Sequence, residues 1–201
     1  MPPRGLWGSS GAARHTTAES WLGRALAASP SRDELLLRYL AGFGPASVMD
    51  VQAWSGLTRM REVAERLRPR LRTFRDQHGV ELFDLPEAPR PDPDTPAPVR
   101  FLPEYDNVLL GHADRSRVVT DDLNGQIFTN EGRNWAWLMI DGFARGSWRI
   151  ARDRGSATLI VRTRTALPGR NKSPVADEGA RLLTFAAAGE RAQNIQFAPA
   201  G

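Results

Sequence analysis

Apolar residues recur at helical spacing in three successive stretches of the first half of the chain. The first stretch, RDELLLRYLAGFG from Arg32, repeats them every three or four positions and stops at Gly42 and Gly44. The second, VMDVQAWS, follows Ser47, a residue type that caps helices, and ends before Gly56. The pattern predicts a helix of about ten residues followed by a very short one.

The third stretch predicts another helix and then a hairpin. The helix is expected to begin at Thr58 as its N-cap and to end near Pro69, because proline lacks the N–H that a helix interior needs. Two segments, RLRTFRD and VELFDLP, flank a three-residue loop that carries glycine, which is typical of a hairpin. Three helices and a hairpin within residues 31–86 predict a winged helix, a helix-turn-helix variant whose third helix enters the major groove.

The pattern changes after residue 86. Residues 87–99 contain five prolines and predict an extended linker. From residue 100 the runs become short, and the predicted strands are RFLP, NVLLGH, RVVT, QIFTN, WAWLMI, ARGSWRI and ATLIVRTR, followed by a helix from Ser173-Pro174 and a last strand, RAQNIQFA. The predicted fold class is therefore α+β: a winged helix, then a small barrel-like or strongly bent β-rich domain over residues 100–201 with a C-terminal helix.

Arginines gather on the predicted third helix and hairpin. Residues 58–75 hold seven arginines against Glu62 and Glu65, an excess of five positive charges, whereas the whole chain carries +4. Guanidinium groups on both flanks of a helix suit two phosphate backbones, so a double-stranded DNA interface is predicted. Its residues are Arg59, Arg61, Arg66, Arg68, Arg70, Arg72 and Arg75, with His78 at the tip of the hairpin. The alternative is a solvated surface on which arginine stems cover the apolar stripe and His78 is an ordinary turn residue.

Composition narrows the function classes. The 201 residues contain no cysteine, which excludes disulfides, cysteine nucleophiles and thiolate metal sites. The three histidines are scattered, so neither a metal site nor a cofactor is expected. The apolar runs are too short for a membrane span and the first residues lack a signal-peptide core, which predicts a cytoplasmic protein with no membrane partner.

Acidic residues and arginines also meet between residues 104 and 117. Glu104 and Asp106 lie near His112 and Asp114, but no second ligand pair follows at a recognised spacing, so an acid–base pair or a metal cluster is not favoured. We interpret Asp106 and Asp114, with Arg115 and Arg117, as an ion-pair and turn network that holds the β-rich domain against the winged helix. The alternative for Arg115 and Arg117 is phosphate contact, and both are included among the candidate DNA-binding residues.

The runs RYLAGFGPASVMDVQAWSGL, FLPEYDNVLLGHADRSRVV and LMIDGFARGSWRI resemble the winged-helix DNA glycosylases of bacteria, the AlkZ-like proteins. The resemblance spans nearly the whole chain, and the segment from FLPEYDN to DRSR is its most specific part. It implies tandem winged helices followed by a β-rich C-terminal domain that together embrace duplex DNA and excise alkylated or crosslinked bases.

The resemblance also implies a catalytic Gln-x-Gln or Gln-x-Asp motif, which this sequence does not contain. None of its five glutamines has glutamine or aspartate two residues later. We therefore expect no catalytic residues in this chain, so that it is an enzyme only if a catalytic domain lies upstream. Residues 1–30, with the large apolar Trp7 and Trp21, are expected to be the end of a preceding domain, which implies a separate N-terminal domain or chain as a partner.

The sequence leaves three functions open. The first is DNA binding by a shortened relative of the glycosylases. The second is a winged-helix transcription regulator, which would need a dimer and a palindromic site. The third is a protein-interaction module that uses the same helical face.

Overall fold

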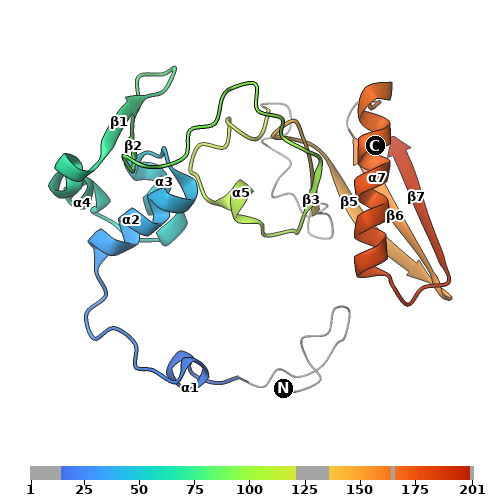
Figure 1. Ribbon diagram of the computed structural model, residues 1–201, viewed down its shortest axis with the longest axis horizontal. Coiled ribbons are helices and arrows are strands. Elements are labelled where there is room, and N and C mark those ends of the chain that lie inside the picture. The colour runs from blue at the N-terminus through green and yellow to red at the C-terminus, as the bar shows by residue number, and fades with distance from the viewer. Residues whose placement is uncertain (1–14, 121–135, 164–165, 200–201) are drawn as a thin grey trace. The chain divides into compact units, whose positions relative to one another are not determined.

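A computed structural model describes residues 15–120, 136–163 and 166–199 of the chain (Figure 1). The chain divides into two compact units, residues 1–32 and 33–201. The described part of the first unit contains helix α1 (Ala18–Leu22), capped by Thr17, whose hydroxyl oxygen accepts a hydrogen bond from the Ser20 N–H at 3.2 Å. Trp21 and Leu22 of this helix are exposed.

Helices α2 (Arg32–Phe43) and α3 (Val48–Ser55) confirm the first two predicted helices. Ser47 caps α3 as predicted. Its hydroxyl oxygen accepts from the Asp50 N–H at 3.2 Å, while the Asp50 carboxylate accepts from the Ser47 N–H at 2.8 Å, so that the two residues form a reciprocal capping box. Gly56 ends α3 with a φ of 69°, a left-handed conformation that glycine adopts without steric cost.

Helix α4 (Met60–Leu67) begins later than the sequence predicted. Thr58 is not its N-cap: Arg59 takes that position with a φ of 60° and makes no capping hydrogen bond. The side-chain oxygen of Gln52 accepts from the Met60 N–H at 3.1 Å instead, so a residue of α3 takes over the role of a local cap. A 3-10 turn, η1 (Arg68–Arg70), follows and contains Pro69, which ends the helix as expected.

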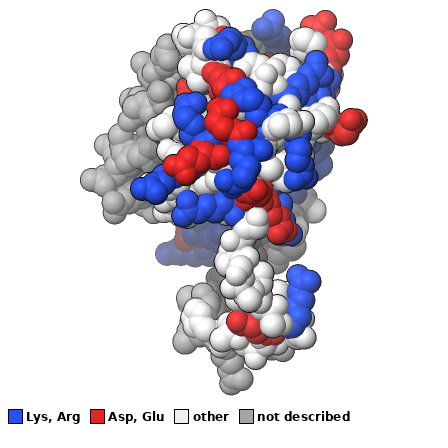
Figure 2. All heavy atoms as spheres, turned by 90° about the vertical axis from the view of Figure 1, so that its left-hand side faces the viewer, with Lys and Arg blue, Asp and Glu red and all other residues white. Residues whose placement is uncertain are grey.

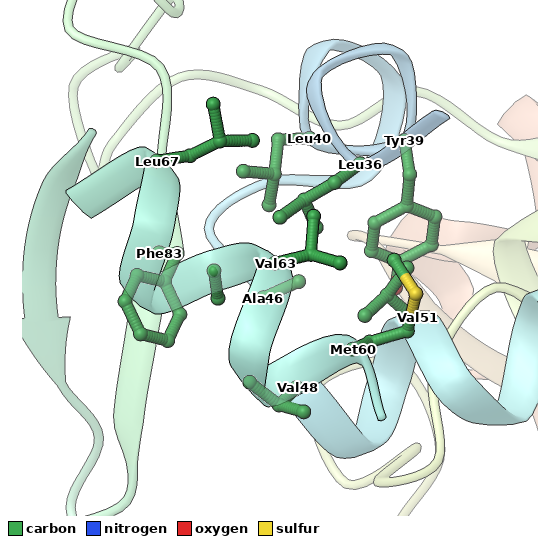
Figure 3. Close-up of a cluster of buried hydrophobic side chains, with 11 residues drawn as sticks. Leu36, Tyr39, Leu40, Ala46, Val48, Val51, Met60, Val63, Leu67 and Phe83 are labelled. Carbon is green, nitrogen blue, oxygen red and sulfur yellow. The ribbon is translucent and has the colours of Figure 1, made fainter. Parts of the chain in front are cut away.

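The predicted hairpin is confirmed as strands β1 (Arg72–Arg75) and β2 (Glu81–Asp84), which pair antiparallel. In its turn, the Asp76 carboxylate accepts from the N–H groups of His78 and Val80, both at 2.8 Å. The three helices and β2 enclose one apolar core (Figure 3). Its buried side chains are Leu36, Tyr39, Leu40, Ala46, Val48, Val51, Met60, Val63, Ala64, Leu67 and Phe83.

Residues 85–99 form no helix or strand, as predicted for the proline-rich stretch. Arg90 connects the start of this stretch to the end of the hairpin. The guanidinium of this residue donates to the Asp84 carboxylate at 3.0 Å and to the Leu85 carbonyl at 2.6 Å. Asp84 is only 1% exposed, so Arg90 neutralises a buried charge.

The second half of the chain contains a five-stranded sheet in the order β3-β4-β5-β6-β7. The strands are β3 (Arg100–Leu102), β4 (Ala136–Ile140), β5 (Phe143–Asp153), β6 (Ser156–Thr163) and β7 (Ala192–Pro199). The first four pair antiparallel, and β7 adds parallel to β6 after helix α7 (Gly169–Ala186). Within the described residues the sheet is open, so the barrel-like prediction was wrong: its faces are covered by other elements instead of by closure of the sheet.

Two further strand predictions were wrong. The run NVLLGH forms a short helix, α5 (Asn107–Leu110), because Asp106 acts as its N-cap and accepts from the Val108 N–H at 2.8 Å. The run RVVT contributes a single bridge between Val119 and Ala144. The predicted strand QIFTN lies outside the described residues.

The two faces of the sheet are buried by different elements. On one face, α7 packs Val175 and Leu183 against Leu138, Leu159 and Val161. On the other face, α5 and the bridge residue cover the sheet, and the buried residues there are Leu109, Val119, Trp137, Met139 and Ala144. Strand β4 is consequently buried along its whole length.

Helix α7 begins at Gly169, four residues before the predicted start, and contains Pro174 in its second turn. Proline so near a helix N-terminus removes only one hydrogen bond, which explains why the helix tolerates it. The buried residues of α7 are Val175, Gly179, Leu183 and Ala186, which form a stripe along one side of the helix. A Cβ atom on Gly179 would lie 2.8 Å from the Leu159 side chain, so glycine lets the helix approach the sheet closely.

Candidate nucleic-acid interface

The predicted arginines of α4 and the hairpin lie on one face of the described structure, together with carboxylates. Figure 2 shows this face, where blue arginine and red acidic side chains alternate over the region of α2, α4 and β1. The structure divides these arginines into two groups, those paired with carboxylates and those without a carboxylate partner.

Arg66 and Arg68 are the paired arginines. The Arg66 guanidinium forms a two-pronged salt bridge with Asp33 of α2, in which Nε donates to Oδ2 at 3.3 Å and Nη2 donates to Oδ1. Arg68 donates to Glu65 at 2.7 and 2.8 Å and to Glu81 at two distances of 3.0 Å. Its guanidinium carbon also lies 5.2 Å from the centre of the Phe83 ring.

These hydrogen bonds favour the ionised carboxylates. The donated bonds from Arg66 lower the pKa of Asp33, and those from Arg68 lower the pKa of Glu65 and Glu81. The three acidic side chains therefore remain charged and neutralise both arginines at neutral pH.

Arg59, Arg61 and Arg70 make no hydrogen bond or ion pair with any residue that the structure describes, and all three are exposed. Arg59 and Arg61 stand at the start of α4, and Arg70 ends the 3-10 turn after it. The helix therefore carries, at both ends, arginines that form no hydrogen-bonded ion pair in the described structure, although the charges of Arg61 and Arg70 are felt by Glu65 and Asp33.

Two hairpin arginines also lack a carboxylate partner among the described residues. Arg72 lies over Phe74, with 5.1 Å between its guanidinium carbon and the ring centre, and Arg75 donates to the Gly79 carbonyl at 2.8 Å. His78 at the tip is exposed, and its Nε2 lies 3.2 Å from the Gln77 side-chain nitrogen. Arg59, Arg61, Arg70, Arg72 and Arg75 are called the open arginines below.

Arg115 and Arg117 belong to a different environment. Arg115 Nε donates to the Leu109 carbonyl at 2.8 Å, and Arg117 Nη1 donates to the Pro45 carbonyl at 2.9 Å. The Asp114 carboxylate accepts from the Ser116 N–H at 2.9 Å. That hydrogen bond is the main cause of the lowered pKa of Asp114, with smaller effects from the charges of Arg117 and His78. The segment is therefore held mainly by side-chain to backbone hydrogen bonds, where the sequence had suggested ion pairs.

Sequence reasoning missed the residues that fasten this segment to the helices. The Asp50 carboxylate, only 3% exposed, accepts from the Ala113 N–H at 2.8 Å and the Asp114 N–H at 3.3 Å as well as from Ser47. The Tyr39 hydroxyl donates to the Gly111 carbonyl at 2.6 Å. The capping position of Asp50 was readable from the sequence, but its second role depends on residues more than sixty positions away.

His112 completes the same junction. Its Nε2 donates to the Phe43 carbonyl at 3.0 Å, and its ring meets the Phe43 ring edge-on with 6.1 Å between centres. Burial lowers the pKa of His112, and the nearby charge of Arg117 lowers it further. Asp50, Tyr39, His112 and Arg117, with the backbone of residues 111–114, are called the junction below.

The acidic residues between positions 104 and 114 do not converge. Asp106 caps α5, Asp114 forms a turn, and Glu104 is exposed. Across the described ranges, no group of three or more histidine and acidic side chains is placed to hold a metal ion. In the same ranges no helix combines the length and apolar character needed to cross a membrane.

The α+β fold can now be compared with known proteins. A family model described as DNA glycosylase AlkZ-like matches residues 1–185, and the chain belongs to this family. Among solved structures, the DNA glycosylase AlkZ of Streptomyces sahachiroi superposes with a TM-score of 0.69 at 20% sequence identity. The match covers 90% of this chain and 50% of that protein, so the chain spans about half its length, and at this identity the likeness shows the fold alone. No curated protein matches the sequence.

Proposed function

We propose that residues 31–86 form a winged-helix domain and that the chain binds double-stranded DNA through it. In this arrangement α2, α3 and α4 are the three helices, and the β1–β2 hairpin is the wing. Helix α4 faces the duplex, and the open arginines at its ends and on the wing contact phosphates. We also propose a cytoplasmic location, where DNA would be accessible to the chain.

The availability of the open arginines carries the proposal. Five exposed guanidinium groups lie along one helix and the strand that follows it, and none has a carboxylate partner in the described ranges. Guanidinium groups bind phosphate oxygens through parallel N–H donors, and such contacts fix a protein on DNA without reading its sequence. Arg75 donates to a carbonyl within its own exposed turn, whereas Arg117 donates to the Pro45 carbonyl 72 positions away and Arg115 to the carbonyl of the buried Leu109, which favours a structural role for Arg115 and Arg117.

Family membership supports a repair context for the proposed interface. We propose that the chain supplies the duplex-holding part of a DNA glycosylase-like activity, since its relatives are described as DNA glycosylases. The exposed carboxylates Glu62 and Glu65 on the outer face of α4 oppose close approach to phosphates, so α4 is expected to bind without a strong sequence preference.

The test is the salt dependence of duplex binding, measured by fluorescence anisotropy with a labelled duplex of random sequence. With five phosphate contacts, the slope of log affinity against log salt is expected to lie near −4 to −5, because each contact contributes about −0.9. Substitution of Arg59, Arg61 and Arg70 together by alanine should make the slope shallower by about 2.7.

A matched control removes the same charge elsewhere. Arg154 of the turn between β5 and β6 and Arg170 and Arg181 of α7 are exposed; their joint replacement by alanine should leave the slope unchanged. A parent slope near zero, or equal losses in both triple variants, contradicts the proposal. A dimer that prefers one palindrome would instead identify a transcription regulator.

A further inference from the structure

The salt bridge between Asp33 and Arg66 differs from the contacts that Arg68 makes with Glu65 and Glu81. Arg68 is held by two carboxylates and also stacks on Phe83, so its guanidinium is fixed by three groups. Arg66 is held by Asp33 alone within the described structure, and 57% of its side chain is exposed. Arg66 is therefore the paired arginine that a competing anion reaches most easily.

The Asp33 carboxylate accepts side-chain hydrogen bonds only from Arg66 in the described ranges. Its two oxygens both point at the Arg66 fork, and the charge of Arg70 contributes to lowering its pKa. An exposed ion pair of this kind contributes little to stability, because solvent screens the attraction and two side chains lose freedom. The contact consequently has little structural value, although its geometry is that of specific guanidinium recognition.

A carboxylate and a phosphate present the same pair of acceptor oxygens to a guanidinium. Arg66 stands on α4, between the open arginines of the helix start and Arg70, so a phosphate that follows this helix passes beside it. The phosphate must then displace the Asp33 carboxylate and overcome its repulsion before Arg66 can contribute.

We propose that Asp33 is an internal competitor of DNA, which occupies Arg66 in the free protein and so limits the affinity for duplex. This inference rests on the proposed DNA binding and adds a residue that sets its strength. Removing the carboxylate leaves Arg66 available for a phosphate, and the number of phosphate contacts rises by one.

A double-mutant cycle tests the proposal on the full 201-residue chain, with the same labelled duplex as above. Asp33→Asn should raise the affinity roughly five- to tenfold at 0.1 M salt and steepen the slope by about 0.9, the contribution of one added phosphate contact. Arg66→Ala alone should change binding little, because the paired arginine contributes little in the parent. In the Arg66→Ala background, Asp33→Asn should raise the affinity much less and leave the slope unchanged, because only its weaker effect on the charge of Arg70 remains.

Two controls separate this mechanism from a general change in charge or in fold. Glu34→Gln alters the same net charge one position away, where the carboxylate pairs with Arg38 at 2.7 Å, and should leave the salt slope unchanged. Asp33→Ser is a second neutral variant and should behave like Asp33→Asn. Glu34→Gln and the two Asp33 variants should each have a melting temperature within a few degrees of that of the parent.

The outcomes are distinct. Equal gains from Asp33→Asn with and without Arg66, or an equal slope change in Glu34→Gln, overturn the competitor role and leave DNA binding intact. Unchanged affinity in both Asp33 variants also overturns it. A parent that binds no DNA in a salt-dependent manner refutes the proposed function itself.

Discussion

The α4–hairpin surface and the junction use the same residue types in opposite ways. On the surface, arginines pair with exposed carboxylates, as Arg66 does with Asp33, or form no ion pair with any described residue, as for Arg61. At the junction, arginine and aspartate bind backbone groups: Arg117 donates to the Pro45 carbonyl, and Asp50 accepts from the Ala113 N–H. A backbone partner stays in place as long as the fold is intact, whereas a carboxylate side chain can rotate away from its arginine.

This difference separates structural charge from charge available for binding. A guanidinium that donates to a backbone carbonyl of another segment stabilises the folded state, because its loss leaves that carbonyl without its donor in the protein. A guanidinium that pairs with an exposed carboxylate contributes much less to the stability of the fold. The number of arginines on a surface therefore overestimates its capacity for phosphates, and their partners decide how many remain available.

The largest effect is expected from Asp50→Ala, a substitution at the centre of the junction. Asp50→Ala removes the acceptor for Ser47, Ala113 and Asp114, leaves their N–H groups without it and deletes the capping box of α3. The free energy of unfolding should fall by about 3 kcal/mol, as measured by urea denaturation. Asp114→Ala, which removes a single exposed turn contact, serves as the control and should cost much less. Equal losses would show that Asp50 has no special role.

A smaller effect distinguishes the two arginine environments directly. Arg117→Ala should lower the free energy of unfolding by about 1 kcal/mol, because the Pro45 carbonyl loses its donor. The same variant should leave the salt slope of DNA binding unchanged. Arg61→Ala is expected to do the reverse, with a slope shallower by about 0.9 and an unchanged unfolding curve. If Arg117→Ala reduces the slope, this arginine contacts phosphate and the division proposed above is wrong.

The smallest expected effect is a pH dependence of the junction through His112. Burial lowers the pKa of His112 in the folded protein below its unfolded value of 6.5, so the unfolded chain binds the proton more readily. This histidine's contribution to stability is therefore present above pH 6.5 and is lost as the pH falls from there towards the folded pKa. The charges that face it are Arg117, Asp50 and Asp114, of which Arg117 opposes protonation and the two aspartates favour it.

His112→Gln keeps a hydrogen-bond donor for the Phe43 carbonyl but removes the titration. The parent should lose stability relative to this variant between pH 6.5 and 5, by no more than about 1.4 kcal/mol per pH unit, the limit for one proton. Urea unfolding of both proteins at a series of pH values measures the difference. A constant difference over this range would contradict the assignment.

Much of the fold follows from local sequence signals. Ser47 with Asp50, Gly56 and Pro69 mark helix ends through hydrogen bonds and sterics that act within a few residues, and all were readable. The strands predicted from WAWLMI, ARGSWRI and ATLIVRTR were readable from their apolar runs and are confirmed as β4, β5 and β6. The clustering of arginines between residues 58 and 75 is likewise a property of the sequence alone.

Other features were decided only by tertiary structure, because they depend on residues far apart in the chain. Asp33 reaches Arg66 across 33 positions, and no periodicity of either helix indicates that pair. The run NVLLGH satisfied a strand pattern, yet it folds as α5, where an aspartate cap and burial against the sheet outweigh the pattern. The open sheet follows from the same cause: α5 and α7 bury its two faces, so the apolar strands are covered without closing into a barrel. The sequence by itself thus determined where charge and apolar residues lie along the chain, and the packing of distant segments determined which of the described arginines form ion pairs and which do not.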